Sequence, residues 1–212
     1  MERVLLTGAT GRLGRQVAWD LAAAGYVVTA AVRDPTRVHA PAFDGAPSVR
    51  VRGCDLANPD AVGRLADLAG DGLVLVHLAS GPPAEASDHA ACTRQVVASI
   101  NLIATFGPLL ALAVIGSCTS VYGATGSLAW VDASLRTTTG TSPEDDHRTR
   151  PTTYHGASQL ASERFWSLFA RNSGKPVARL RFSPFAGAAD VRRASAAVLA
   201  TLQAGEGGLF HA

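Results

Sequence analysis

Short apolar runs alternate along the chain with longer segments in which apolar residues recur every three or four positions. The second pattern is that of an amphipathic helix, and it is clear at 14–24 and 152–171. The short runs are rich in Val and Leu, which is typical of strands buried on both faces of a parallel sheet. The alternation therefore predicts an α/β fold, a doubly wound parallel sheet with helices on both faces. The expected strands lie at 3–7, 26–32, 48–52, 72–78, 109–115, 177–182 and 208–211, and the expected helices at 14–24, 60–69, 88–106, 152–171 and 190–205.

The alternation is interrupted once, over residues 124–153. This segment is rich in Thr, Ser, Gly and Asp and predicts a long loop, which is either solvated or lies over a site. Two interpretations of Trp130 within it stay open, contact with a ligand and packing of the loop itself. No internal repeat is visible, and we expect residues 1–212 to form a single domain.

The composition narrows the class of protein. Of 212 residues, 47% are apolar and 17% are charged, which is the balance of a globular protein with a sizeable core. A net charge of +2 without a basic cluster predicts no nucleic-acid partner. No apolar stretch approaches the ~20 residues of a membrane span, so no membrane partner is expected.

The cysteines and lysines add two constraints. Cys54, Cys92 and Cys118 have unrelated spacings that predict neither a disulfide framework nor a metal site. Since the sequence also starts without a signal peptide, we expect a cytoplasmic protein. Of the 19 basic residues only Lys175 is a lysine, so any chemistry that requires a lysine must use Lys175.

A glycine motif follows the first expected strand and opens the first expected helix. Its pattern is Gly-x-x-Gly-x-x-Gly. Gly8 allows a tight turn, Gly11 lets a pyrophosphate approach the backbone, and Gly14 lets the helix pack on the strand. The helix N-terminus supplies N–H donors and a partial positive charge, so the motif predicts a dinucleotide site. The expected cofactor contacts in this loop are Gly8, Thr10, Gly11, Arg12, Leu13 and Gly14.

The end of the second strand bears on the choice of cofactor. A site selective for NAD places Asp or Glu there to bind the ribose 2′-OH. This chain has Val32 followed by Arg33, and a guanidinium can bind a 2′-phosphate with two hydrogen bonds. With Arg12 nearby in the glycine loop, the sequence favours NADP(H) over NAD(H). The alternative is that Arg33 only pairs with Asp34 or solvent.

Six motifs occur in a characteristic order: TGATGRLG, VRDP, CDL, HLAS, SCTSVYG and PTTYHGASQLASE. In this order the chain resembles the extended short-chain dehydrogenase/reductase family, the NAD(P)-dependent epimerase/dehydratase group, over nearly its whole length. The resemblance implies a Rossmann fold, a small-molecule substrate and a homodimer through the helices at 88–106 and 152–171. It also implies that Asp55 and Leu56 flank the adenine and that Ala79 and Ser80 line the cofactor.

The resemblance also implies a large substrate lobe after the sixth strand. Here Gly187 leads almost directly into the last expected helix, so the lobe is largely deleted. The loop at 124–153 is then a candidate cover for the cleft.

The catalytic residues of that family are changed in this chain. The family uses a Tyr-x-x-x-Lys pair on one helix face, together with a Ser or Thr. Pro151 and Glu163 fix the register and place His155 at the tyrosine position and Gln159 at the lysine position. The Ser/Thr position is Cys118.

Two neighbours of these positions remain candidates for a catalytic role. Tyr154 lies one residue away from the tyrosine position, rotated ~100° around the helix, and an irregular helix start could bring it inward. Thr119 follows Cys118 directly.

These residues leave several chemistries open. His155 has an ordinary pKa near ~6.5 that suits proton transfer at neutral pH, but it could also be a surface residue. Cys118 and His155 could form a nucleophile–base pair, or Cys118 could simply fill the strand end.

The leading hypothesis is a divergent NADP-dependent enzyme of specialised metabolism, a ketone reductase, epimerase or related isomerase or cyclase. In it His155 or Tyr154 handles the proton of a small ketone or hydroxy metabolite. The alternatives are a catalytically inactive NADP(H)-binding sensor or scaffold and an enzyme that uses no cofactor.

Overall fold

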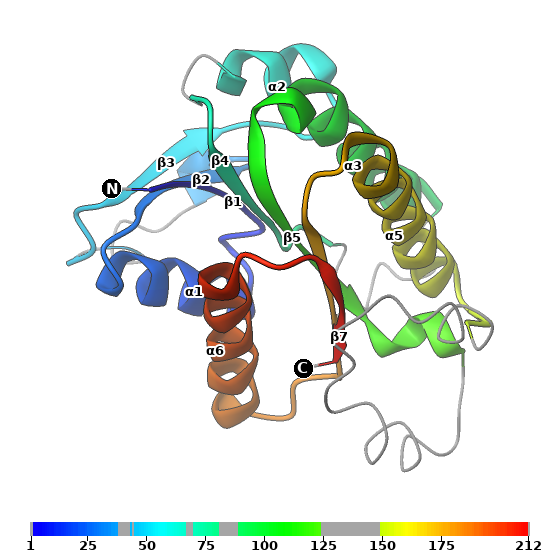
Figure 1. Cartoon of the computed structure of the whole chain (residues 1–212). Coiled ribbons are helices and arrows are strands. Elements are labelled where there is room, and N and C mark those ends of the chain that lie inside the picture. The colour runs from blue at the N-terminus through cyan, green and yellow to red at the C-terminus, as the bar shows by residue number, and fades with distance from the viewer. Residues whose placement is uncertain are drawn as a thin grey trace.

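Figure 1 shows the computed structural model of the chain, which describes residues 2–37, 43, 45–66, 70–80, 89–123 and 149–211. Its described strands form a seven-stranded sheet in the order β3-β2-β1-β4-β5-β6-β7, and every neighbouring pair is parallel. The predicted α/β, doubly wound parallel sheet is confirmed. The strands are β1 (Arg3–Thr7), β2 (Val27–Val32), β3 (Val49–Gly53), β4 (Leu73–His77), β5 (Leu110–Cys118), β6 (Val177–Phe182) and β7 (Gly208–His211).

Helices cover both faces of the sheet (Figure 1). α1 and α6 pack together on one face, while α2, α3 and α5 cover the other. The helices are α1 (Arg12–Ala23), α2 (Pro59–Ala66), α3 (His89–Phe106), α5 (Tyr154–Ser173) and α6 (Ala188–Ala204), with short 3-10 helices η1 (Pro35–Arg37), η4 (Gly107–Leu109) and η5 (Thr119–Tyr122).

Strands in the middle of the sheet, such as β4, are largely apolar because they supply two cores. Along β4, Val74 and Val76 belong to the core under α1 and α6. Leu73 and Leu75 alternate with them and belong to the core under α2, α3 and α5, which also contains Trp166. Successive strand residues point to opposite faces, so a strand buried on both faces loses the apolar–polar alternation of a half-exposed one.

Two element boundaries differ from the prediction in a way that matters for the site. β5 continues past residue 115 to Cys118, because Gly116, Ser117 and Cys118 still pair with β6. α5 begins at Tyr154 rather than at residue 152, because the Thr153 hydroxyl caps the helix by accepting a hydrogen bond from the Gly156 N–H at 3.0 Å. Residues 67–69 of the expected second helix and residues 124–148 of the expected loop, with Trp130, lie outside the described residues.

The lysine Lys175 lies far from the carboxyl ends of the strands. Its Nζ donates hydrogen bonds to the carbonyl oxygens of Pro108 and Leu110, at 2.6 and 2.7 Å. These carbonyls stand where β5 begins, at the amino end of the parallel strands. Lys175 therefore stabilises the entry into β5 and is not part of a site at the opposite edge of the sheet.

Candidate functional site

The loops after β1 and β4 meet where the strand order reverses. β1 lies between β2 and β4. The sheet continues from β2 to β3 on one side of β1, and from β4 to β5 on the other side. In open α/β sheets, ligands bind in the crevice that such a reversal leaves at the carboxyl ends of the strands. The glycine motif lies directly after β1, at this point of the sheet.

The glycine loop has the close approaches that its spacing predicts. Gly8 has a positive φ of 75°, and a Cβ there would lie 2.6 Å from the carbonyl carbon and oxygen of Leu78. A Cβ on Gly14 would lie 2.1 Å from the Gly8 carbonyl oxygen. A side chain at Gly8 or Gly14 would therefore require the neighbouring backbone to move.

Gly11 leaves the start of α1 open. It is the exposed N-cap residue and provides no side-chain hydrogen bond to the helix. The first amides of α1, those of Arg12, Leu13 and Gly14, have no partner within the helix, as at any helix start. Thr10 and the Arg12 side chain are exposed beside them, while the Leu13 side chain packs into the core. The loop thus offers backbone donors to an anion.

The other predicted cofactor contacts follow the neighbouring strands. Arg33 is exposed directly after buried Val32, at the end of β2. Asp34 accepts hydrogen bonds from the backbone N–H and the hydroxyl of Thr36, at 3.0 and 2.6 Å. Arg33 and the glycine loop therefore lie at the same edge of two paired strands.

The segment after β3 contributes Asp55 and Leu56. The exposed Asp55 carboxylate accepts a hydrogen bond from the Ala57 N–H at 3.1 Å, which holds the turn. Half-buried Leu56 is tied to α3, because the Asn101 amide donates to its carbonyl oxygen at 2.9 Å. This brings both residues to the carboxyl edge of the sheet beside β2.

A buried histidine connects the loop after β4 to the rest of the site, and sequence reasoning missed it. His77 Nδ1 lies 2.7 Å from the Thr7 hydroxyl, and its Nε2 lies 3.3 Å from the Ser99 hydroxyl. Burial lowers the pKa of His77 to about 4. The Thr7 oxygen also accepts a hydrogen bond from the Ala79 N–H at 3.3 Å. This series of hydrogen bonds positions half-buried Ala79 and the exposed Ser80 that follows it.

His155, at the tyrosine position of the family pattern, lies beside the end of β5. Its Nε2 lies 3.5 Å from Cys118 Sγ, and Cys118 Sγ lies 2.6 Å from the Ser120 hydroxyl. Both Cys118 and His155 are partly buried. Burial lowers the pKa of His155 and raises the pKa of the Cys118 thiol. At neutral pH the imidazole and the thiol are therefore both uncharged.

The remaining candidates differ in where they point. Tyr154 is 55% exposed, and its ring lies against His89 with 4.0 Å between ring centroids. Because α5 begins regularly at Tyr154, no irregularity turns this side chain inward. Gln159 is only 3% exposed. Thr119 is buried in the first turn of η5.

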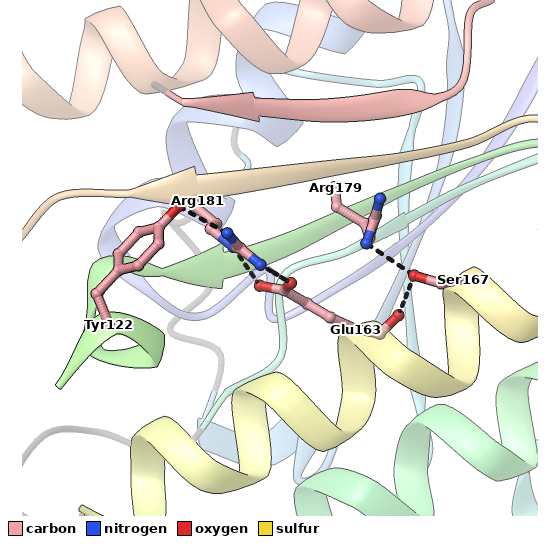
Figure 2. A network of polar contacts seen from close by, with 5 residues as sticks. All are labelled: Tyr122, Glu163, Ser167, Arg179 and Arg181. Carbon is pink, nitrogen blue, oxygen red and sulfur yellow. Dashed lines mark hydrogen bonds and ion pairs between the residues drawn. The ribbon is translucent and has the colours of Figure 1, made fainter. Parts of the chain in front are cut away.

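A buried ion pair joins α5 to β6 behind this site (Figure 2). Arg181 donates to the Glu163 carboxylate from Nε at 2.9 Å and from Nη2 at 2.6 Å, and to the Tyr122 hydroxyl from Nη1 at 2.6 Å. Next to it, Arg179 donates to the Ser167 hydroxyl, which donates to the Glu163 carbonyl oxygen, both at 2.7 Å. Tyr122 belongs to η5, so the network holds α5, β6 and η5 together.

The profile of the NAD dependent epimerase/dehydratase family matches residues 4–210 of the sequence. The chain belongs to this family. Membership confirms the resemblance carried by the six motifs and implies a nicotinamide cofactor. No match was found among curated protein sequences.

Solved structures of similar fold include longer epimerases. The UDP-Glc/GlcNAc 4-epimerase of Campylobacter jejuni has a TM-score of 0.77 and 14% identity, covering 100% of this chain and 78% of that chain. The UDP-glucose 4-epimerase of Thermotoga maritima, solved with UDP-glucose, has a TM-score of 0.68 and 17% identity, covering 85% of this chain and 55% of that chain. At this identity the similarity shows the fold alone.

A third structure was solved with the cofactor that the family name implies. It is the UDP-glucuronic acid 4-epimerase of Bacillus cereus in complex with UDP-glucuronic acid and NAD. Its TM-score is 0.64 at 20% identity, and it covers 85% of this chain and 56% of that chain. This chain thus spans little more than half the length of two of the three proteins compared.

The geometry of the glycine loop is compatible with the dinucleotide that the family name implies. The turn at Gly8 has no room for a side chain, and Gly11 leaves the amides at the start of α1 without a side-chain cap. The described residues bring together no group of three potential metal ligands. None of the described helices is long and apolar enough to span a bilayer.

Proposed function

We propose that the chain binds NADP(H), in preference to NAD(H), and acts on a small ketone or hydroxy metabolite of specialised metabolism. The reaction is a reduction, an epimerisation or a related isomerisation or cyclisation, in which His155 transfers the proton. A nicotinamide cofactor in the crevice would supply the hydride chemistry. The protein's own residues supply the proton transfer and the positioning of the substrate oxygen.

The observation that carries this proposal is the placement of His155. Of the two adjacent candidates, His155 reaches the end of β5, while Tyr154 is exposed and stacks on His89. The end of β5 is where the family resemblance expects the side chain that binds the substrate oxygen. An imidazole there can transfer a proton to or from that oxygen.

The lowered pKa of His155 favours one direction of proton transfer, from the substrate to the imidazole. Because burial keeps the ring neutral at neutral pH, His155 is ready to accept the proton of a substrate hydroxyl. Reduction of a ketone needs the protonated ring instead. A reduction that uses His155 is therefore expected to become faster as pH falls toward the pKa of this residue.

The preference for NADP(H) is supported by Arg33. Its side chain is exposed after β2, at the edge where the glycine loop begins. A guanidinium there can bind a 2′-phosphate with two charge-assisted hydrogen bonds. Arg12, exposed at the start of α1, adds a second positive charge to the same edge.

Gln159 favours a second candidate function, a catalytically inactive NADP(H)-binding sensor. It occupies the lysine position, is buried, and carries no charge that could lower the pKa of a neighbouring acid. A sensor would bind NADPH without turnover. An active enzyme would bind NADPH and use it.

Two measurements test the proposal and separate the candidates. In the first, NADPH and NADH are titrated against intrinsic tryptophan fluorescence. We expect Arg33→Ala to weaken NADPH binding about tenfold, or ~1.4 kcal/mol, with little effect on NADH. Equal affinity of the unmodified chain for both nucleotides would contradict the role of Arg33.

The second measurement is NADPH oxidation with a panel of small ketones. We expect His155→Ala to lower the rate at least ~100-fold at unchanged NADPH affinity, while Tyr154→Phe stays close to the wild-type rate. Tight NADPH binding with no turnover on any ketone would favour the sensor. A His155→Ala variant as active as wild type would overturn the role of His155.

We also propose a homodimer through α3 and α5. The groove between these helices has a volume of about 390 Å³ and is lined mainly by apolar side chains. Ile100, Phe165 and Leu168 stay 39%, 41% and 45% exposed on this face. A second copy of the same helix pair would cover these side chains from water.

A further inference from the structure

Cys118 differs from the other cysteines of the chain in its position. All three cysteines are free, and Cys54 and Cys92 are buried. Cys118 is only partly buried and lies at the carboxyl end of β5, next to His155. Of the three thiols, that of Cys118 is therefore the most accessible to a small reagent.

The local backbone holds His155 against this thiol. Gly156 packs directly on η5, since a Cβ there would lie 2.4 Å from the Ser120 carbonyl oxygen. The Thr153 cap fixes where α5 begins. These two constraints place His155 Nε2 at 3.5 Å from Cys118 Sγ, and the Ser120 hydroxyl contacts the same sulfur at 2.6 Å.

We propose that Cys118 is a nucleophile, with His155 as its base, that adds to α,β-unsaturated carbonyl compounds. The thiol is a soft nucleophile, and the β-carbon of an enone is a soft electrophile. This inference rests on the proposed function in one respect: both proposals place a carbonyl compound beside His155.

The addition needs no oxidant and no cofactor. The sulfur forms a bond to the β-carbon, and the π electrons of the double bond move toward the carbonyl oxygen. The thiol proton passes to His155 Nε2 and from there to the α-carbon of the enolate. The product is a saturated carbonyl compound bound to Cys118 as a thioether, with no atom lost.

The charges around the sulfur explain why a base is required. Burial raises the pKa of Cys118, and the Glu163 carboxylate adds to this effect, while the Ser120 hydrogen bonds and Arg181 oppose it. Glu163 and Arg181 pair with each other, so their fields at the sulfur oppose one another. The thiol is therefore protonated at neutral pH, and addition is fast only when neutral His155 accepts the proton.

The experiment measures adduct formation by intact mass and peptide mapping, with cyclohexenone as the probe and no nucleotide present. We expect one adduct, on Cys118, formed at least ~10-fold more slowly in His155→Ala and in His155→Gln. Between about pH 6.5 and 8 the wild-type rate should stay nearly constant, because neutral His155 takes the proton. In both His155 variants the rate should rise about tenfold per pH unit, as free thiolate becomes the nucleophile.

The controls keep this outcome separate from the proposed function. Cys118→Ser should form no adduct, and Cys92→Ala should react like wild type, with circular dichroism confirming the fold of each variant. An adduct on Cys54 or Cys92, or equal rates with and without His155, would overturn the inference. NADPH binding is titrated separately, so a chain that fails to bind nucleotide but forms the adduct contradicts only the proposed function.

Discussion

The Glu163 carboxylate and the Arg181 guanidinium form an ion pair from which water is excluded. Their side chains are 1% and 0% exposed, and Nη2 lies 2.6 Å from Oε2. Removing one partner leaves the other charged and buried, which typically costs about 3–5 kcal/mol. We therefore expect Arg181→Met to lower the free energy of unfolding by this amount in urea titrations.

A double variant distinguishes the loss of the ion pair from the cost of leaving one charge buried without its partner. In Glu163→Leu with Arg181→Met no charge is left unpaired, and much of the lost stability should return. Arg171→Ala, on the exposed surface of the same helix, should change stability by less than ~0.5 kcal/mol. An Arg181→Met variant as stable as wild type would show that the buried pair contributes little.

His77 is expected to make the fold sensitive to acid. Its pKa is lowered by burial from 6.5 to about 4. Between these values the unfolded chain binds a proton that the folded chain does not, so stability is retained above pH 6.5 and falls as pH decreases toward 4. This pKa difference corresponds to a loss of about 3 kcal/mol in the free energy of unfolding.

The measurement is the free energy of unfolding against pH for wild type and His77→Asn. Subtracting the two curves removes the contribution of groups that both proteins share. The difference should be largest at neutral pH and shrink as the solution is acidified. Parallel curves would mean that His77 is not held neutral in the folded chain.

The glycine loop predicts a graded response to added methyl groups. Gly8→Ala combines a φ of 75° with contacts of 2.6 Å to Leu78, so it should lose both stability and NADPH binding. Gly11→Ala meets only the Gly8 carbonyl oxygen, at 3.3 Å. It should fold, but bind NADPH more weakly, because the methyl group faces the approaching phosphates.

Gly63 in α2 offers a matched control. A Cβ there would meet nothing within 4 Å, so Gly63→Ala should stabilise the helix by roughly 0.5–1 kcal/mol and leave NADPH binding unchanged. Thermal unfolding and the nucleotide titration measure both effects. Undiminished NADPH binding by Gly8→Ala would place the nucleotide elsewhere.

The α3/α5 face predicts the state of assembly. Leu168→Glu puts a charge on the exposed apolar face that we propose to be shared by two copies. Sedimentation should show a dimer for wild type and a monomer for this variant. Ala196→Glu, on the exposed side of α6, should remain dimeric. A wild-type chain that is monomeric at all concentrations would refute the homodimer.

The sequence predicted the parts of the fold that depend on local patterns. The glycine loop is recognised from a motif of seven consecutive residues, and the strands are recognised from short apolar runs. Both could therefore be located from the sequence alone. β1, β6 and β7 have the predicted bounds, and the other strands differ by up to three residues at an end. The family motifs also made Cys118 and His155 candidates for one site, and these two side chains lie 3.5 Å apart.

Contacts between distant segments could not be predicted in this way. His77 is held by Thr7 and Ser99, residues 70 and 22 positions away, and its only signal was a polar residue within a buried strand. The orientation of His155 depends on how closely Gly156 approaches η5. The role of Lys175 at the start of β5 is likewise a contact between segments that are 65 to 67 residues apart.

The central claim is that His155, and not Tyr154, is the acid–base group beside the cofactor. The most direct test is a crystal structure of the chain with NADP⁺, in which the distances from both side chains to C4 of the nicotinamide are measured. We predict that the dinucleotide lies on the glycine loop and that the His155 ring is the nearer of the two. A structure with the Tyr154 hydroxyl nearer to C4, or with NADP⁺ bound away from the glycine loop, would contradict the claim.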